Sequence, residues 1–280
     1  MNKYFARLFA AGILLTSSIA MAADGPEAPN RPVALKHLGL VVLDPGHGGS
    51  NRGCLGVDGT YEKQVVLEIS RRVARILRAE TTAEVRLTRT DDRFLGLRER
   101  TRMANEWGAD VLLSMHVNAD PQGKGHGVET WHLAHEAADA EARRIVEKEE
   151  GHVMEFHASE APLSEPHLRI LEDARIRRAQ EDSATLAELV HDGMHNTTQA
   201  RPRGVKQAPF GVLKEARMPA IVVEAGFFSH EVQGVDLMSE RYQEQVARGI
   251  VDGLVAFDAR IGGDSRPHVS ATTRTAHTDR

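Results

Sequence analysis

Apolar and polar residues alternate along the chain in short blocks that predict strands and helices in turn. Short apolar runs predict strands at 38–43, 83–90, 110–119, 127–133 and 219–229, and residues 211–216 are also strand-like. Apolar residues spaced three and four apart predict helices at 61–80, 95–108, 183–195 and 241–260. This alternation predicts an α/β fold, in which one domain has a twisted, mostly parallel or mixed sheet with helices on both faces.

Four segments differ from this pattern, which leaves 37–260 as the main domain. Residues 23–36 are rich in Pro and Ala and are expected to form a linker. Residues 135–182 are charge-dense, have a helical pattern and are too long for an ordinary connection, so they read as a helical insertion. Residues 261–280 lack an apolar period and are expected to be a disordered tail. The fourth segment is the N-terminus.

Residues 1–22 have the features of a cleaved secretory signal peptide. Lys3 and Arg7 precede an apolar stretch over 8–19, and Ala20 and Ala22 supply small residues before a cleavage point. The apolar stretch is short for a bilayer span, which needs about 20 residues. The expectation is therefore a periplasmic protein without a stable membrane span after cleavage.

Composition narrows the classes of function. Hydrophobic residues make up 41% of the 280, enough for a core, while the net charge of −5 gives no electrostatic reason to expect nucleic-acid binding. The single cysteine, Cys54, excludes an internal disulfide framework and a cysteine-based zinc ribbon.

Polar residues follow three of the predicted strands at their carboxyl ends. The first strand leads to His47, the strand at 110–119 carries His116 and Asn118, and the strand at 219–229 carries Glu224. Glu62 lies in the first turn of the helix after the His47 loop. Ligands of open α/β sheets bind at the carboxyl ends of the strands, so these side chains are expected to converge.

Their chemistry suits a catalytic zinc site. Such a site often takes two His and one Glu and leaves a position for water, and His47, Glu62 and His116 supply that set. A zinc hydrolase also needs a carboxylate that moves a proton between the water and the leaving amine. Glu224 lies in an apolar strand, where burial raises a carboxyl pKa, and is the candidate for this role.

Each residue also has a plainer interpretation. His47 could lie in an exposed turn, Glu62 could interact only with its helix dipole, and His116 could be a buried histidine with ordinary partners. A rival metal pair, His191 and His195, shares one helical face, but it lacks the adjacent glutamate of zinc peptidases and its helix has a surface-like pattern. The four residues taken together favour the first set.

Several motifs resemble, in order, the zinc-dependent N-acetylmuramoyl-L-alanine amidases of the cell-separation type. They are VVLDPGHGG, TYEKQVVLEISRRV, VRLTRTDDRFLGLRERTRMAN, ADVLLSMHVNA, GVETWHL and FGVLKEARMPAIVVEAGFFSH. The resemblance implies a six-stranded sheet, an amidase catalytic domain over 37–260, and hydrolysis in peptidoglycan of the amide between N-acetylmuramic acid and L-alanine, in wall remodelling or daughter-cell separation. By motif, the zinc ligands fall on His47, Glu62 and His116 and the catalytic glutamate on Glu224. Asn118 is a candidate for orienting substrate or His116.

The insertion also has a counterpart in this family. Several Gram-negative members carry a helical segment there that blocks the zinc site with a glutamate until an activator protein docks. The resemblance therefore implies that residues 135–182 are autoinhibitory, with Glu136 or Glu141 as the occluding residue, and that a periplasmic activator binds them. Two other functions stay open from the sequence. These are a zinc peptidase acting on the stem peptides and a non-catalytic wall-binding regulator on the same fold.

Overall fold

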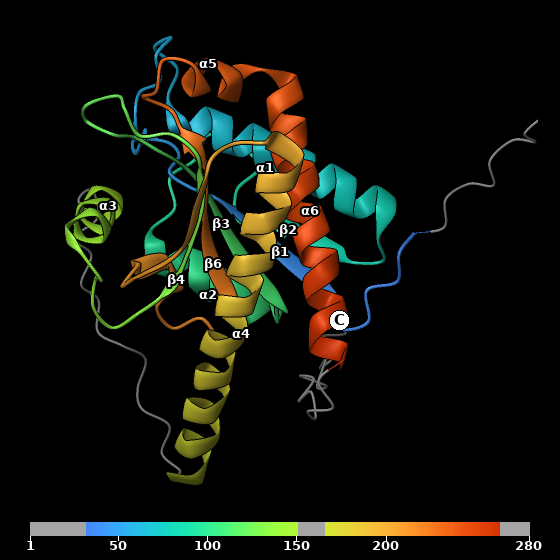
Figure 1. Cartoon of the computed structure of the whole chain (residues 1–280). Helices are drawn as coiled ribbons and strands as arrows, with labels where there is room; N and C mark the ends of the chain where they lie inside the picture. The colour runs from blue at the N-terminus through green and yellow to red at the C-terminus, as the bar shows by residue number, and fades with distance from the viewer. Residues whose placement is uncertain (1–31, 151–165, 264–280) are drawn as a thin grey trace, which may run out of the picture. The chain divides into compact units, whose positions relative to one another are not determined.

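Six strands form one mixed sheet in the order β2-β1-β3-β6-β4-β5 (Figure 1). The strands β2, β1, β3 and β6 run parallel, β4 runs antiparallel to β6, and β5 runs parallel to β4. Their bounds are β1 Leu40–Pro45, β2 Glu84–Leu87, β3 Val111–Asn118, β4 Val128–Leu133, β5 Pro202–Ala208 and β6 Ala220–Phe227. This computed structural model describes residues 32–150 and 166–263. The expected signal peptide and most of the expected linker and tail lie outside these residues.

Helices cover both faces of the sheet, as the sequence predicts. The helices α1, α4 and α6 pack against one face, and α2, α3 and the short helix η1 pack on the other (Figure 1). The bounds are α1 Glu62–Glu80, α2 Leu97–Trp107, α3 Ala140–Glu150, α4 Pro166–Thr198, η1 Gly211–Leu213, α5 Gln233–Met238 and α6 Glu240–Gly263.

The central strands are buried along their whole length. All the residues of β1, β3 and β6 are buried. A strand covered on both faces reads as a continuous apolar run, which is why these strands were predictable. Alternate residues face opposite helical layers, so Leu113 and Met115 join the core under α1 and α6 while Leu112 joins the core under α2.

Two helices approach each other closely through glycine. A Cβ atom on Gly193 of α4 would overlap the backbone of Gly249 of α6, and a Cβ on Gly249 would overlap Gly193. Only glycine permits this backbone contact. Leu186, Val190 and Met194 of α4 are fully buried beside it, so the surface-like character expected for this helix is wrong.

The sixth strand is not where the sequence placed it. Residues 211–213 form η1 instead of a strand, and β5 occupies Pro202–Ala208. The helix α4 also continues unbroken from Pro166 to Thr198, so the insertion boundary expected at residue 182 lies inside one helix. In the described part of the chain, none of the helices is both long enough and apolar enough to cross a membrane.

Candidate metal centre

Four buried side chains from four separate segments meet on the α2 and α3 face of the sheet. They are His47 from the loop after β1, Glu62 from the start of α1, His116 from β3 and Glu149 from α3. Each offers one ligand atom, and these atoms all lie within 4.8 Å of one another. The structure thus brings together the three ligands expected from the sequence and adds a fourth side chain, the carboxylate of Glu149.

The distances between these atoms suit a tetrahedral ion. The Oε1 atom of Glu62 lies 3.0 Å from His47 Nε2 and 3.2 Å from His116 Nδ1. The Oε2 atom of Glu149 lies 3.2 Å from His47 Nε2 and 3.1 Å from His116 Nδ1. Ligand atoms on a tetrahedral zinc ion, at about 2.0–2.1 Å from it, are about 3.3 Å apart. The cluster therefore has room for one small cation.

Two buried arginines hold the loop that carries His47. The guanidinium of Arg100, on α2, donates to the carbonyl oxygens of Pro45 and His47, and Arg89 donates to those of Pro45 and Gly46. His47 itself adopts a left-handed backbone conformation, with φ of 59°. Five donors on a planar fork let each arginine bind several carbonyl groups at once, which fixes this strained turn.

The loop also selects the orientation of the His47 ring. Its Nδ1 atom lies 2.9 Å from Asn51 Oδ1, and that oxygen also accepts from the backbone N–H of Gly53. The Nδ1–H group therefore donates to Asn51, which leaves the Nε2 lone pair directed at the cluster. Gly46 is equally necessary, because a Cβ atom there would overlap the ring of His116.

Glu62 is held as a carboxylate by backbone donors. Its Oε1 atom accepts from the N–H of Val117 and its Oε2 atom from the N–H of Cys54. Burial acts to raise the pKa of Glu62, but His47, Lys148 and the bond to His116 outweigh it, so the pKa is well below its ordinary value. Burial and the nearby Glu62 raise the pKa of the Cys54 thiol, so Cys54 is a neutral neighbour and not a thiolate ligand.

His116 and Glu224 are neighbours on adjacent strands. They form a register pair between β3 and β6, and Glu224 is fully buried with no hydrogen-bond partner on either carboxylate oxygen. Burial raises the pKa of Glu224 well above its ordinary value, although Lys148 and His116 act in the other direction. Glu224 is thus beside the cluster, as a carboxyl group that binds a proton more readily than an ordinary glutamate does.

The helix α3 delivers Glu149 into the cluster. Ala142, Ile145 and Val146 form a buried apolar stripe on α3, and Glu149 continues the same stripe one turn later. Lys148 lies beside it, with Nζ 3.1 Å from Glu149 Oε1 and 3.5 Å from Glu62 Oε2. Glu149 therefore contacts both histidines of the cluster, as the carboxylate of Glu62 also does.

The unsatisfied polar atoms test whether these residues fit a metal ion. In the described ranges, every buried side-chain nitrogen or oxygen without a hydrogen-bond partner belongs to this cluster or its neighbours, namely His47 Nε2, Lys148 Nζ and both oxygens of Glu149 and of Glu224. Buried polar groups normally have partners. Histidine and carboxylate donors at these spacings fit a single cation such as zinc.

The other sequence-predicted residues lie elsewhere. The amide nitrogen of Asn118 donates to Glu129 Oε1 at 2.8 Å and its amide oxygen accepts from the N–H of Ala119, so these bonds connect Asn118 to Glu129 and to its own loop and not to His116. Glu136 is exposed, and Glu141 pairs with Arg203 and Lys206. The glutamate that contacts the two histidines is therefore Glu149, and not Glu136 or Glu141 as expected from the sequence.

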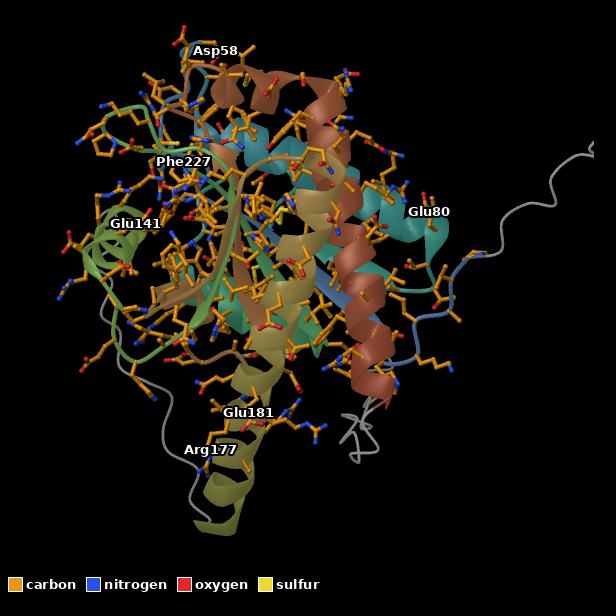
Figure 2. The ribbon with its side chains drawn as sticks, viewed as in Figure 1. Asp58, Glu80, Glu141, Arg177, Glu181 and Phe227 are labelled. Atoms are coloured by element: carbon orange, nitrogen blue, oxygen red, sulfur yellow. The ribbon has the colours of Figure 1, made fainter. Side chains whose placement is uncertain are left out.

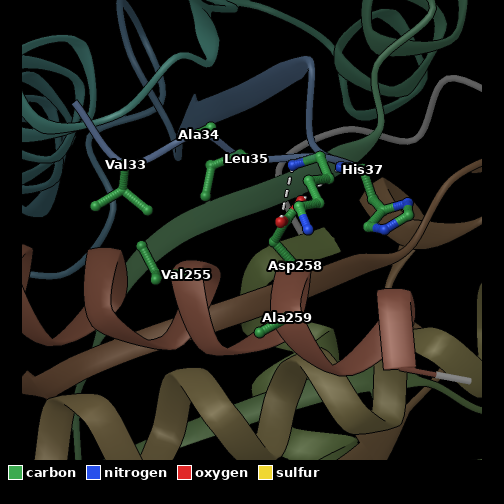
Figure 3. Close-up of a pocket in the computed structure, with 8 residues that line it drawn as sticks. Val33, Ala34, Leu35, His37, Val255, Asp258 and Ala259 are labelled. Atoms are coloured by element: carbon green, nitrogen blue, oxygen red, sulfur yellow. Dashed lines mark hydrogen bonds between the residues drawn. The ribbon is translucent and has the colours of Figure 1, made fainter. Parts of the chain in front are cut away.

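The rival histidine pair on α4 has structural partners. His191 Nε2 accepts from the N–H of Gly204, and His195 Nδ1 contacts the carbonyl oxygen of Ala200. A pocket of about 380 Å³ lies outside the cluster as well, between residues 33–37 and the C-terminal part of α6 (Figure 3). There Asp258 accepts from the N–H groups of Lys36, His37 and Leu38, which accounts for its burial without a ligand.

Comparison with known proteins agrees with this geometry. Residues 41–256 match the family model described as N-acetylmuramoyl-L-alanine amidase. The chain is 30% identical over 232 residues to N-acetylmuramoyl-L-alanine amidase AmiA of Escherichia coli (strain K12), covering 81% of this chain and 80% of AmiA. The crystal structure of N-acetylmuramoyl-L-alanine amidase from Clostridium difficile 630 is similar at a TM-score of 0.60 and 30% identity, over 79% of this chain and 97% of that one.

A further solved structure supports the fold alone. The CwlD amidase from Clostridioides difficile, solved in complex with the GerS lipoprotein, is similar at a TM-score of 0.59 and 22% identity, over 79% of this chain and 97% of that chain. With the family model spanning most of the chain, the protein belongs to the N-acetylmuramoyl-L-alanine amidase family and is a hydrolase of peptidoglycan.

Proposed function

We propose that this amidase uses one zinc ion, held by His47, Glu62 and His116, with Glu224 as the group that moves protons. The observation that carries the proposal is the cluster itself, in which Glu62 Oε1 lies 3.0 and 3.2 Å from one nitrogen of each imidazole, beside a buried, unpartnered glutamate. Zinc bound there would polarise the scissile carbonyl and lower the pKa of a water molecule.

Glu224 then acts twice in the hydrolysis. Its raised pKa lets a carboxylate oxygen accept a proton from the attacking water and keep it in a site shielded from solvent. The same oxygen gives that proton to the nitrogen of L-alanine as the amide bond to the lactyl group breaks. A neutral amine can leave, whereas an amide anion cannot, so this second transfer completes the cleavage.

We propose further that α3 inhibits the enzyme in the conformation described here. Glu149 contacts both histidines, and the helix covers the face of the sheet on which Glu224 lies. Substrate cannot reach Glu224 until α3 moves, so a partner protein that binds α3 would activate the enzyme. The CwlD structure, with GerS bound, is an amidase of this fold in complex with another protein.

Zinc stoichiometry and product analysis test the main proposal. His47→Ala and His116→Ala should each lower the zinc content of the purified chain, while Glu224→Gln should keep zinc and lose hydrolysis of purified sacculi. Mass spectrometry of the digest should show intact stem peptides released from glycan. Full activity of Glu224→Gln would remove Glu224 from the chemistry, and cleaved stem peptides would indicate a peptidase.

The place of action follows from the substrate. We propose that residues 1–22 direct export and are removed after Ala22, so that the enzyme meets peptidoglycan in the periplasm and contributes to daughter-cell separation. The N-terminal sequence of the mature protein tests the first part, with Ala23 expected as its first residue. Chains of unseparated cells on deletion of the gene test the second.

A further inference from the structure

A second cluster of charges lies beside Glu224, centred on Glu129 of β4. Glu129 is fully buried and forms a register pair with Glu224 on β6. Its Oε1 atom accepts from Asn118 and Trp131, and its Oε2 atom accepts from Arg203 at 2.6 Å and Lys206 at 2.9 Å. The row of His116, Glu224 and Glu129 thus runs across three adjacent strands of the sheet and ends at two cations.

Those two cations have a second carboxylate partner on α3. Arg203 Nη2 lies 2.5 Å from Glu141 Oε1, and Lys206 Nζ lies 3.1 Å from Glu141 Oε2. Each oxygen of Glu141 therefore has its own cation, which is a two-point grip on a carboxylate. Figure 2 shows Glu141 on α3, and the same helix also places Glu149 against the histidines.

The proposed movement of α3 would uncover the histidine cluster and the Arg203–Lys206 pair together. Arg203 and Lys206 carry two positive charges, and Glu129 balances only one of them. Without Glu141, one positive charge stays unbalanced on a half-buried surface, which favours a new anion. The pair is preorganised, because the Arg203 guanidinium lies 4.8 Å from the centre of the Phe227 ring and Lys206 Nζ lies 5.0 Å from that of Trp131.

The spacing of the sheet sets which anion can reach the pair. The strand β5 is two positions from β6, so the backbone of β5, which carries the two cations, is about 10 Å from that of β6. An extended peptide covers roughly 3.3–3.6 Å per residue. A carboxylate one to three residues beyond the scissile amide therefore comes within reach. In peptidoglycan, the residue after L-alanine in the stem peptide is acidic.

We propose that Arg203 and Lys206 bind a carboxylate of the stem peptide during catalysis, and that Glu141 occupies this subsite while α3 covers the site. The inference rests on the proposed function and adds to it the part of the substrate that the enzyme recognises. The pair acts on substrate binding and orientation, whereas Glu224 acts on the bond that breaks.

The test uses the zinc-loaded full chain opened by Glu149→Ala. Its substrates are two synthetic muramoyl tripeptides that differ only in whether the α-carboxyl of the second residue is free or amidated. The opened enzyme should prefer the free carboxylate about tenfold in kcat/KM, mainly through KM, because a charge-assisted bond is lost on amidation. Lys206→Met in the same background should reduce this preference to about one.

Two further variants separate binding from folding. Lys206→Met combined with Glu129→Gln removes both charges of the ion pair between Lys206 and Glu129, so the net charge of the cluster stays that of the opened enzyme. Lys36→Met removes an exposed lysine elsewhere and should leave the preference unchanged. A purely structural role for Lys206 would lower turnover of both tripeptides equally, and that result overturns the inference.

The remaining outcomes distinguish the two proposals. Equal hydrolysis of both tripeptides by the opened enzyme overturns the carboxylate subsite and leaves the amidase mechanism in place. Hydrolysis of neither tripeptide, with one zinc ion bound per chain, overturns the proposed function and this inference with it. A preference for the free carboxylate that survives Lys206→Met and the double variant places recognition elsewhere and also overturns the subsite.

Discussion

The residues around His47 show how buried charge positions a side chain that we propose as a metal ligand. Asp44 is fully buried on β1 and accepts from Arg100 at 2.8 Å, from Thr88 and from Ser114. The same guanidinium group donates to the carbonyl of His47. Asp44 thus holds Arg100, and Arg100 holds the loop that carries His47. A substitution of Asp44 or Arg100 should therefore change the position of His47 in the cluster.

The close contact of Gly46 with His116 gives a first prediction. Gly46→Ala should displace the His116 ring, because a Cβ atom would overlap it, and zinc affinity should fall by about 10–100-fold, as for other changes that misplace a ligand. Isothermal titration of the metal-free chain with zinc measures this. His126→Ala removes an imidazole outside the cluster and should bind zinc normally. Unchanged affinity in Gly46→Ala would show that His116 is not a ligand.

The Asp44–Arg100 pair gives a prediction for stability. Asp44→Asn leaves the buried Arg100 uncompensated and should lower the free energy of unfolding at pH 7 by about 3 kcal/mol. Arg100 and the hydroxyl groups of Thr88 and Ser114 outweigh burial and lower the pKa of Asp44. Asp44 therefore contributes its full stabilisation above about pH 3.9, which is the pKa of an aspartate in the unfolded chain. This stabilisation is lost as the pH falls through the lower pKa that Asp44 has in the folded chain.

Urea unfolding with a chelator present, at pH 7 and at pH 3, checks the sign. The difference in the free energy of unfolding between the native chain and Asp44→Asn should be large at pH 7 and should become smaller below pH 4. The exposed Asp58→Asn serves as the control and should change stability by less than about 1 kcal/mol at either pH. A difference that grows on acidification would contradict the assignment.

The sequence revealed the side chains that follow strands, and for a physical reason. His47, His116 and Glu224 lie at or near strand ends, and parallel strands bring their carboxyl ends to one edge. Glu149 lies on a helix whose position is set by packing. The signal for it was present, since a glutamate continues the apolar stripe of Ala142, Ile145 and Val146, but only a docked helix shows that this stripe is buried.

At the scale of elements, α3 is attached to the sheet at two separate places. Its first turn is held by the ion pairs of Glu141 with Arg203 and Lys206. Its last turn is held by Lys148 and Glu149 at the cluster. Two separate attachments of this kind suit the proposed movement of α3 for substrate entry.

Removing the second attachment should activate the enzyme. Glu149→Ala should raise the rate at which the full chain hydrolyses purified sacculi without any partner, because it removes the carboxylate that contacts both histidines. A roughly tenfold rise in rate corresponds to a loss of about 1.4 kcal/mol from the free energy that favours the closed position of α3. Glu147→Ala, an exposed glutamate on the same helix, is the matched control. Equal rates in the two variants would show that Glu149 does not limit access.

The edge strand β5 marks the limit of prediction for the fold. Its residues, PRGVKQA, contain Pro and Gly and are mostly half-buried, so they show neither an apolar run nor strict alternation. The apolar residues of 211–216 resemble a strand more closely, yet Val212 and Leu213 are buried as part of η1. Arg203 and Lys206 of this strand pair with Glu129 and Glu141, while Val205 and Ala208 contact the apolar cores, so charged and apolar positions are mixed along it.

At the scale of the molecule, the two faces of the sheet have different roles. The face under α1, α4 and α6 is apolar and contains most of the buried aliphatic side chains. The opposite face carries Asp44, His116, Glu129 and Glu224 among its apolar residues. The site is thus built on a rigid sheet whose stability comes mainly from the other side, and α3 can leave it without exposing the main core.

Zinc should therefore stabilise the whole chain and hold α3 at the same time. Binding to the folded state alone adds about 4.1 kcal/mol at a free zinc concentration of a thousand times Kd, which should raise Tm. Because His47, Glu62, His116 and Glu149 come from four segments, zinc should also slow amide hydrogen exchange both in α3 and at the start of α1.

In Glu149→Ala, three of the proposed ligands remain, so the rise in Tm and the protection of α1 should persist while the added protection of α3 disappears. Mass spectrometry of exchanged peptides, with and without zinc, measures both segments in one sample. Equal added protection of α3 in the native chain and in Glu149→Ala would mean that the helix is held without Glu149, and the attachment of α3 to the metal centre would then be wrong.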